Sequence, residues 1–373
     1  MNKRIAVFHF SPLELYPPVM NFLDCLQEKL SENDLVWVYT TRPPASMELY
    51  IPKRKQVSIK RLAYYTVTLS AASRIVQYLR YYLNSFIQCL RFRPSKLFYY
   101  ETISSFIPYL LKKLRGNQVE LFIHYHEYMT PKEYGQMILN KTFHQLEKRI
   151  YNRAKWISHS NKYRMQLFLK DLGSPSLTNT HIFPNYPPAA WVSPAKDKII
   201  QPVKLMYVGS MGSLEMLYIR EIFEWIESNS GAVLLDIYSF KVAEEIKSFS
   251  AETSCNYIKW KGPIAYKNLP QIIKLYDTGL ILYKGLSANT IYSASNKLFE
   301  YLVCGLDVWY PVELIGSHEY NSPEFWPKVL PLDFSRLGQY NLDELVERKA
   351  GYRRQVNYSC EDAASELINM IIS

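Results

Sequence analysis

The sequence predicts an α/β protein built from two doubly wound, Rossmann-like domains, each with a parallel β-sheet. Short apolar runs alternate with longer segments of helical period, a pattern typical of βα units. The alternation stops once, at a polar stretch that contains several prolines, and then begins again. A chain of 373 residues is long for one hydrophobic core and sufficient for two.

Residues 1–183 form the first predicted domain. The apolar run at its start is too short for a signal peptide and is interpreted as the first strand. The expected strands are 5–10, 35–40, 97–100, 121–124 and 156–159, and the expected helices are 18–30 and 134–154. Repeated units of this kind predict a sheet that is covered by helices on both faces.

Residues 184–202 form the predicted linker, which begins with Pro184-Asn185-Tyr186-Pro187-Pro188. Residues 203–354 form the second predicted domain. Its expected strands are 203–208, 233–238, 257–260, 278–283 and 306–310, and its expected helices are 214–228, 242–248, 269–276 and 295–305. A last amphipathic helix is expected at 360–372.

Composition narrows the class of protein. Hydrophobic residues make up 48% of the chain, which is typical of a globular protein. The five cysteines are scattered without a C-x-x-C pair, which argues against a disulfide framework or structural zinc and fits a reducing cytoplasm. No stretch approaches the roughly 20 apolar residues that cross a bilayer. We therefore expect a cytoplasmic protein that is soluble or bound at the inner face of the membrane.

The formal charge of +10 is concentrated in one region, residues 53–115, where basic residues are interleaved with tyrosine and phenylalanine. This composition favours contact with an anionic membrane surface. Nucleic acid is not an expected partner, because no helix-turn-helix, RNP-type motif or zinc finger accompanies the basic residues. A solvated basic surface over buried aromatic residues is the alternative interpretation.

The segment Ser295–Gly305 is the most informative motif for function. Its predicted helix begins near Asn296, which is a competent N-cap, and helix N-termini attract phosphate. Lys297 adds a full positive charge at that end. Glu300 lies three residues further on the same face and could accept two hydrogen bonds from a sugar diol. The alternative is an ordinary amphipathic helix with a solvated Lys–Glu pair.

Two glycine-containing turns follow predicted strands of the second domain. Gly209, Ser210 and Gly212 follow the first of these strands and precede a predicted helix, so their backbone amides could approach a diphosphate. The pattern is not a full G-x-G-x-x-G and has no acidic residue at the dinucleotide spacing, so no nicotinamide cofactor is expected. The second turn contains Trp260 and Gly262 and is interpreted equally well as a plain strand-ending turn.

The sequence His124-Tyr125-His126-Glu127 ends a predicted strand of the first domain. Two histidines two residues apart share one side of a strand, but no third ligand has a recognisable spacing, so no metal site is expected. His126 lies where open α/β sheets bind their ligands, at the carboxyl end of a strand. Glu127 either orients His126 or accepts a proton from the substrate.

Taken in order, these motifs resemble the retaining glycosyltransferases of GT-B fold, of the glycosyltransferase family 4 or group 1 type. The resemblance rests on His126 and Glu127, the Pro-Asn-Tyr-Pro linker, the Val-Gly-Ser turn, and Lys297, Glu300, Tyr301, Gly305 and Val308. It implies two domains facing a cleft, with the C-terminal segment 355–373 returning to complete the first, acceptor-side domain. The implied donor-binding residues are Gly209, Ser210, Gly212, Gly262, Asn296, Lys297 and Glu300, and the implied catalytic residues are His126 and Glu127.

The resemblance also implies the reaction. The expected activity is metal-independent transfer of a sugar, with retention, from a nucleoside-diphosphate sugar to a saccharide or lipid-linked saccharide in surface polysaccharide or glycoconjugate biosynthesis. No cofactor is expected besides this donor substrate. Many relatives have a glutamate eight residues before Glu300, where this chain has Tyr292. The alternatives are therefore a non-catalytic sugar-nucleotide-binding or scaffold relative, and a GT-B fold sugar-nucleotide epimerase.

Overall fold

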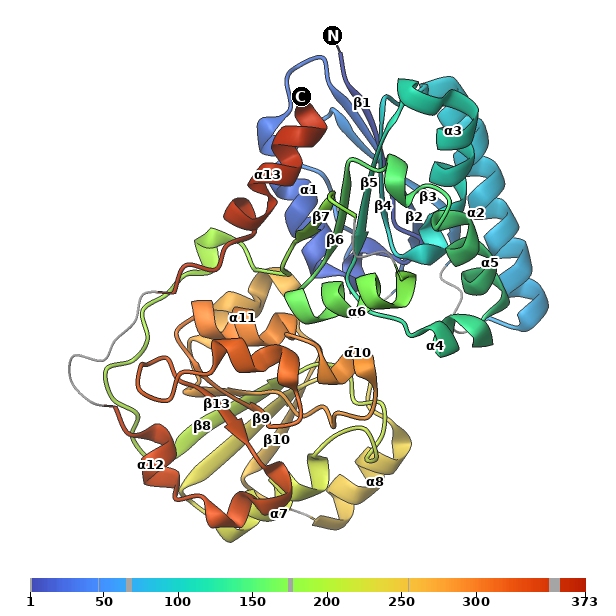
Figure 1. Cartoon of the computed structure of the whole chain (residues 1–373). Helices are drawn as coiled ribbons and strands as arrows, with labels where there is room; N and C mark the ends of the chain where they lie inside the picture. The colour runs from blue at the N-terminus through green and yellow to red at the C-terminus, as the bar shows by residue number, and fades with distance from the viewer. Residues whose placement is uncertain (1, 46, 65–68, 174–176, 254, 349–355) are drawn as a thin grey trace. The chain divides into compact units, whose positions relative to one another are not determined.

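The computed structural model describes residues 2–45, 47–64, 69–173, 177–253, 255–348 and 356–373. The chain divides into two compact units (Figure 1). Unit 1 consists of Met1–Asn185 together with Cys360–Ser373, and unit 2 consists of Tyr186–Ser359. The predicted end of the second domain at 354 and the predicted start of the returning segment at 355 lie outside the described residues.

Unit 1 contains a seven-stranded sheet in the order β3-β2-β1-β4-β5-β6-β7, and each described strand pair is parallel. The strands are β1 (Arg4–Phe8), β2 (Leu35–Arg42), β3 (Val57–Tyr64), β4 (Lys96–Tyr100), β5 (Glu120–Tyr125), β6 (Trp156–His159) and β7 (Thr180–Ile182). The edge strands β3 and β7 were not predicted from the sequence.

Helices cover both faces of this sheet (Figure 1). They are α1 (Pro17–Lys29), α2 (Ala71–Phe92), α3 (Phe106–Arg115), α4 (Pro131–Gln136), α5 (Ile138–Glu147), α6 (Lys162–Leu172) and α13 (Cys360–Ile372). On one face Tyr81 of α2 and Phe143 of α5 join the core. On the other face Phe22 of α1 packs in the same core as Leu367 of α13, so the last helix completes unit 1.

One helix prediction in unit 1 is corrected. The single helix expected at 134–154 is divided into α4 and α5, because Met137 between them has an extended backbone conformation. The start of α4 is set by a capping box, in which Thr130 and Glu133 satisfy each other's backbone N–H groups.

Unit 2 contains a six-stranded sheet in the order β10-β9-β8-β11-β12-β13, again with parallel pairs. The strands are β8 (Val203–Val208), β9 (Val233–Tyr238), β10 (Ile258–Gly262), β11 (Thr278–Leu280), β12 (Asp307–Pro311) and β13 (Val329–Leu332). The helices are α7 (Ile219–Ser228), α8 (Glu244–Thr253), α9 (Leu269–Ile273), α10 (Ala288–Ile291), α11 (Asn296–Val303) and α12 (Leu342–Val346). The two sheets confirm the predicted class of two Rossmann-like domains.

The helix expected at 214–228 begins only at Ile219. The preceding segment contains a turn at 214–216 and is tied down by two isolated bridges, between Met211 and Val242 and between Leu217 and Tyr283. Backbone pairing with distant residues therefore delays the helix. Among the described residues, no helix has both the length and the apolar character needed to span a membrane.

Tyr301 fixes α11 against the centre of the unit 2 sheet. A Cβ added to Gly279 of β11 would lie 2.1 Å from a ring atom of Tyr301, so only glycine lets this ring approach the strand. The hydroxyl oxygen of Tyr301 accepts a hydrogen bond from the backbone N–H of Val208, at 3.0 Å. The helix is thereby anchored at both β8 and β11.

We predict that Gly279→Ala lowers the free energy of unfolding by about 1–3 kcal/mol, because the added methyl group overpacks the contact with Tyr301. Urea unfolding measures this change. Gly338→Ala is the matched control, since a Cβ at that position meets nothing within 4 Å. Equal effects of the two substitutions would contradict the packing argument.

Candidate active site

In unit 2 the strand order reverses between β8 and β11, since the chain moves from β8 outward to β10 and then returns to the other side. Open α/β sheets bind ligands at such a switch point, beyond the carboxyl ends of the strands. Gly209 directly follows β8, and the loop after β11 leads to α10 and α11. The predicted donor residues of these segments therefore lie at the end of the sheet where a ligand is expected.

The N-terminus of α11 carries the main charged pair of this region. Ser295 caps the helix, and its side-chain oxygen accepts a hydrogen bond from the N–H of Lys297 at 3.3 Å. The ammonium nitrogen of Lys297 lies 2.6 Å from a carboxylate oxygen of Glu300. The side chain of Glu300 is 2% exposed and that of Lys297 is 20% exposed. Glu300 thus holds Lys297 at a helix end that favours anions, while the lysine side chain stays partly exposed.

The turn after β8 differs from its predicted form. Gly209, Ser210 and Gly212 were expected to open a helix, but α7 begins only at Ile219, so these residues do not form a helix N-terminus. The N–H of Gly209 already donates to the carbonyl of Tyr238, at 3.1 Å. The expectation that this turn opens a helix is therefore wrong, whereas donor contact by the backbone of residues 209–212 stays a prediction. The helix N-terminus at this switch point belongs to α11.

Lys284, in the loop after β11, is held by neighbouring side chains. Its ammonium nitrogen lies 2.9 Å from a carboxylate oxygen of Glu221 and 4.9 Å from the ring centroid of Tyr218. The hydroxyl of Tyr218 donates to Glu313 at 2.6 Å. Arg220, on α7, lies over the ring of Phe249.

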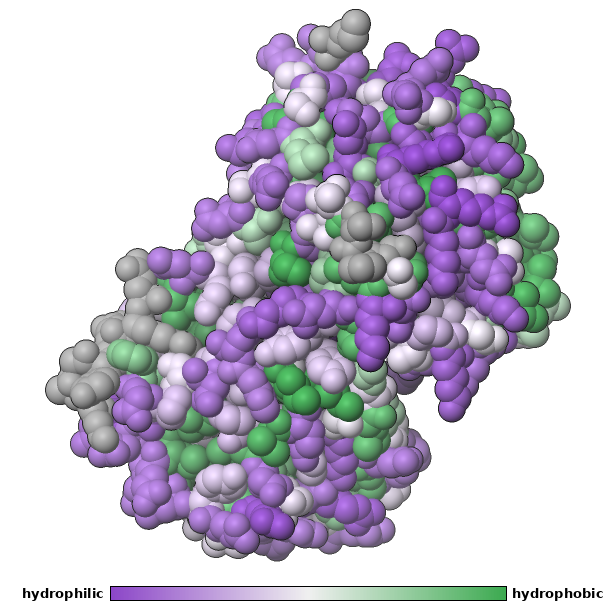
Figure 2. All heavy atoms as spheres, viewed as in Figure 1, coloured by the Kyte–Doolittle hydropathy of each residue, from purple (hydrophilic) through white to green (hydrophobic). Residues whose placement is uncertain are grey.

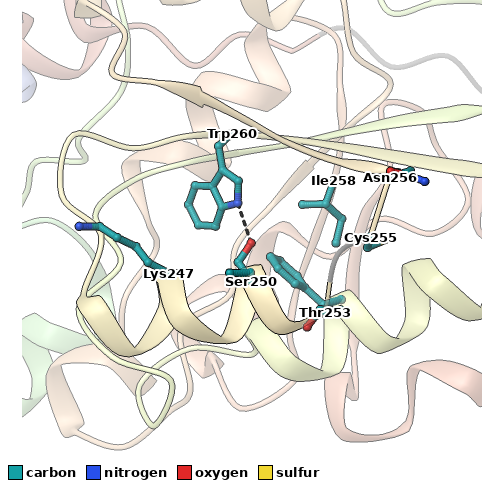
Figure 3. Close-up of a pocket in the computed structure, with 9 residues that line it drawn as sticks. Lys247, Ser250, Thr253, Cys255, Asn256, Ile258 and Trp260 are labelled. Carbon is teal, nitrogen blue, oxygen red and sulfur yellow. Dashed lines mark hydrogen bonds between the residues drawn. The ribbon is translucent and has the colours of Figure 1, made fainter.

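Gly262 ends β10 with φ at +75°, a conformation that favours glycine, and its carbonyl accepts the N–H of Ser239 at 3.0 Å. Trp260 of the same strand lines a pocket of about 550 Å³ between α8 and β10 (Figure 3). Its indole N–H donates to the hydroxyl oxygen of Ser250 at 2.8 Å. None of the predicted donor-binding residues lines this pocket, so it is separate from the candidate donor site.

In unit 1 the strand order reverses between β1 and β4, and a cluster of aromatic side chains and histidines lies where the strands end. His126 follows β5 and is 5% exposed. Its ring stacks on Tyr100 with centroids 5.0 Å apart, and the ring of His124 meets it edge-on at 4.7 Å. His9, which follows β1, lies 6.3 Å from His126 between ring centroids.

The hydrogen bonds of His126 define its tautomer. Nδ1 lies 3.2 Å from the side-chain oxygen of Asn185, so this nitrogen donates and Nε2 is left as the acceptor. Among the described residues, Nε2 is buried and has no hydrogen-bond partner. Burial, reinforced by His124 and His9, lowers the pKa of His126 well below its usual range. A neutral imidazole with a free Nε2 suits acceptance of a hydrogen bond from a hydroxyl group, and not charge stabilisation.

The backbone that carries His126 and Glu127 is held from two sides. One carboxylate oxygen of Glu101 accepts the N–H of His126 at 2.6 Å and the N–H of Glu127 at 3.2 Å. Arg164 of α6 donates to the carbonyl of His126 and, at 3.0 Å, to the hydroxyl of Ser160. Glu127 itself is exposed, so its carboxylate remains available.

Glu101 has a strained backbone, with φ at 61° and ψ at 150°, a region that is populated almost entirely by glycine. Such strain persists only when surrounding interactions compensate for it, and the two hydrogen bonds to the His126–Glu127 turn do so. Burial, with a further contribution from the charge of Glu127, raises the pKa of Glu101 to about 8. The turn thus depends on a carboxyl group that ionises near neutral pH.

Sequence reasoning missed Glu101, Arg164 and Asn185 as parts of this site. Glu101 directly follows the buried strand β4, as His126 follows β5. Because open α/β sheets bind ligands at the carboxyl ends of their strands, an inspection of the residue after every predicted strand would have found it. Arg164 had no such signal, and Asn185 was recognised only as part of the Pro-Asn-Tyr-Pro linker. Among the described residues, no group of three histidine, cysteine, aspartate or glutamate side chains is arranged to hold a metal ion.

We predict that Glu101→Gln becomes more stable relative to wild type as pH rises. The native carboxyl of Glu101 keeps its proton up to a pH of about 8, whereas the unfolded chain releases it near 4.5, so wild-type stability falls between these values. Glutamine still accepts both N–H groups but does not ionise. Urea unfolding at about pH 5 and about pH 8 measures the difference. A constant difference at both pH values would show that Glu101 does not titrate in this window.

Comparison with known proteins gives the fold. No protein-family model and no curated protein sequence matches this chain. Sucrose-phosphate synthase from Thermosynechococcus elongatus aligns with a TM-score of 0.66 and 12% identity, covering 100% of this chain and 95% of the synthase. The apo form of the lipopolysaccharide outer core galactosyltransferase WaaB aligns with a TM-score of 0.60 and 13% identity, covering 99% of this chain and 94% of WaaB.

HepE from Anabaena, in complex with UDP and glucose, aligns with a TM-score of 0.61 and 10% identity, covering 100% of this chain and 96% of HepE. A UDP-N-acetylglucosamine 2-epimerase also shares the fold, with a TM-score of 0.56. At these identities the likeness is one of fold. The chain therefore has the GT-B fold, which glycosyltransferases and epimerases share.

Proposed function

We propose that this protein is a glycosyltransferase that uses a nucleoside-diphosphate sugar as donor. The observation that carries the proposal is the Lys297–Glu300 pair at the capped N-terminus of α11, anchored by Tyr301 at the switch point of unit 2. A diphosphate would bind the ammonium group and the helix-terminal amides, and Glu300 would accept hydrogen bonds from the ribose. Because HepE was solved with UDP and with glucose, UDP-sugars are the first donors to test.

The proposed chemistry requires stabilisation of the leaving group. The bond between the anomeric carbon and the diphosphate oxygen breaks, and its electron pair leaves on the diphosphate. Lys297 and the N-terminal amides of α11 would stabilise that charge. The acceptor hydroxyl attacks from the same face, its oxygen bonds to the anomeric carbon, and its proton passes to the departing diphosphate. Retention results without a protein nucleophile, and no metal or cofactor takes part.

His126 and Glu127 are assigned to the sugars. The role proposed for neutral His126 is to accept a hydrogen bond from a sugar hydroxyl at Nε2, and the contacts of Glu101 and Arg164 with the backbone at His126 keep this nitrogen in place. The exposed carboxylate of Glu127 orients the acceptor. We propose a saccharide or lipid-linked saccharide as acceptor, in surface polysaccharide or glycoconjugate synthesis at the inner face of the membrane.

A sugar-nucleotide epimerase is the second candidate, since one shares the fold. A non-catalytic sugar-nucleotide-binding or scaffold protein is the third, because Tyr292 stands where many transferases have a glutamate. An epimerase and a sugar-nucleotide-binding protein both retain nucleotide binding, so they differ from the transferase in products and not in the donor site, whereas a scaffold protein need not bind a nucleotide.

We predict that UDP stabilises the wild-type protein and that Lys297→Ala weakens this effect. At about a hundredfold excess over Kd, UDP adds ~2.7 kcal/mol of stability, roughly 5–10 °C in Tm for a unit of this size. Loss of a charge-assisted hydrogen bond of about 1.5–3 kcal/mol raises Kd roughly 10–150-fold. Thermal unfolding with UDP, GDP, ADP and CMP measures the shifts, and Glu300→Gln tests the ribose contact without emptying a buried position.

Lys247→Ala is the matched control. Like Lys297, Lys247 pairs with a glutamate three residues away on a helix of unit 2. Unlike Lys297, it lines the pocket in Figure 3. The control should keep the full UDP shift. Loss of the shift in Lys247→Ala but not in Lys297→Ala would move the nucleotide to that pocket and overturn the proposed site.

We predict that the purified protein releases UDP from its donor sugar and that His126→Gln lowers this rate by about tenfold, the effect of one lost hydrogen bond in the transition state. The UDP-induced shift in Tm should be unchanged in this variant. Chromatography of the sugar nucleotides distinguishes the alternatives. An epimerase converts one UDP-sugar into another without releasing UDP, and a non-catalytic protein leaves the donor unchanged.

A further inference from the structure

Helix α2 has an unusually apolar outer face. Large apolar side chains recur along it at helical spacing and are 39–64% exposed: Ile75, Val76, Leu79, Leu83, Ile87 and Leu90. We call these six residues the α2 stripe. In Figure 2 apolar side chains gather along the edge of unit 1 where Figure 1 draws α2. A helix that covers a sheet normally has a polar outer face, so this stripe needs an explanation beyond the packing of unit 1.

The inner face of the same helix already supplies its share of the core. Tyr81, Cys89 and Phe92 are buried in the unit 1 core beneath the sheet-covering helices. The hydroxyl of Tyr81 donates to the backbone carbonyl of Tyr39 on β2, at 3.1 Å. Residues of the stripe therefore cannot be core residues displaced by a rotation of the helix, because the opposite face is fully engaged.

The charged residues of α2 are all basic. The 22 residues Ala71–Phe92 contain no aspartate or glutamate. Arg80 and Arg91 are exposed and lie three or four residues from members of the stripe, on its flank. Helix α3 packs on α2 through the rings of Phe106 and Tyr82. Near the end of α3, Lys113 and Leu114 are both exposed, so a basic and an apolar side chain again lie next to each other.

We propose that the α2 stripe docks unit 1 on a bilayer that contains anionic lipid. The helix lies in the plane of the interface, with the six apolar side chains among the acyl chains and the arginines at the level of the phosphate groups. From Val76 to Leu90 the stripe runs about 21 Å along the helix, long enough for several lipid headgroups. This inference rests on the membrane-surface part of the proposed function and not on glycosyl transfer.

A second copy of this chain fits the stripe less well. Pairing of two α2 helices through their stripes would bring Arg80 and Arg91 of both copies together with no acidic residue on either helix to neutralise them. An anionic lipid surface supplies the missing negative charge, and charge complementarity therefore favours the membrane.

Flotation with vesicles tests this proposal. Wild-type protein should float with vesicles of phosphatidylcholine containing about 30% phosphatidylglycerol and float much less with phosphatidylcholine alone. The triple variant Leu79→Gln/Leu83→Gln/Ile87→Gln should lower partitioning by more than about tenfold, because three apolar side chains are lost from the interface. Arg80→Gln/Arg91→Gln should lower partitioning to the anionic vesicles by roughly tenfold and leave the weak binding to neutral vesicles unchanged.

The matched control is Val192→Gln/Ile200→Gln/Leu275→Gln, which replaces three apolar residues of unit 2 that are 52–68% exposed. It should float like wild type. Equal flotation of the α2 triple variant and wild type, or absence of wild-type flotation, would overturn the proposal. Light scattering after size-exclusion chromatography measures the oligomeric state and tests whether a second copy binds the stripe instead. If wild-type protein is a dimer and the α2 triple variant is a monomer, the stripe is a contact between two copies and the membrane proposal is overturned.

The UDP-induced shift in Tm separates this proposal from the proposed function. The α2 triple variant should keep the shift, which also shows that it is folded, and Lys297→Ala should still float. If wild-type protein floats but shows no UDP shift, the membrane surface is supported and the donor site is contradicted. If it shows the UDP shift but does not float, the donor site is supported and the membrane surface is contradicted.

Discussion

Parallel pairing of the strands is the constraint on which the rest of this structure depends. In the described part of the chain, both sheets consist of parallel pairs, so each needs helices on both faces and each gathers its carboxyl strand ends at one edge. At that edge the chain is free of the sheet ladder and can place polar side chains. The candidate residues His126, Glu101 and Lys297 all depend on this, because each lies on a segment that leaves the carboxyl end of a strand.

The two units use this edge for different chemistry. Unit 2 presents a helix N-terminus and an ammonium group that a buried carboxylate holds in place, an arrangement suited to phosphate. Unit 1 presents His126 among aromatic rings, and burial keeps this imidazole neutral. A neutral imidazole with one free nitrogen suits the hydroxyl groups of a sugar. The two strand-end edges therefore differ in the chemistry that their side chains offer, a positive charge in unit 2 and a neutral hydrogen-bond acceptor in unit 1.

Covering the sheet accounts for only one face of α2. A helix can bury only one face against a sheet, and α2 buries the face that contains Tyr81 and Phe92. The outer face is then free of structural demands, and on this helix it is apolar and flanked by arginine. Packing of unit 1 therefore explains the inner face of α2, and the proposed contact with an anionic bilayer explains the outer face.

Local pattern by itself determined the fold class and much of the element order. Residues 156–159, 203–208 and 233–238 are strands as predicted, because buried parallel strands are continuous apolar runs, and Cys360–Ile372 is a helix as predicted from its amphipathic period. The pairing of Lys297 with Glu300 was also foreseeable, since residues three apart share a helix face.

Only tertiary structure decided the rest. The late start of α7 depends on bridges to Val242 and Tyr283. The backbone of His126, just after β5, is held by the side chains of Glu101, which follows β4, and Arg164 of α6. Such contacts join residues far apart in the chain, so no local spacing encodes them.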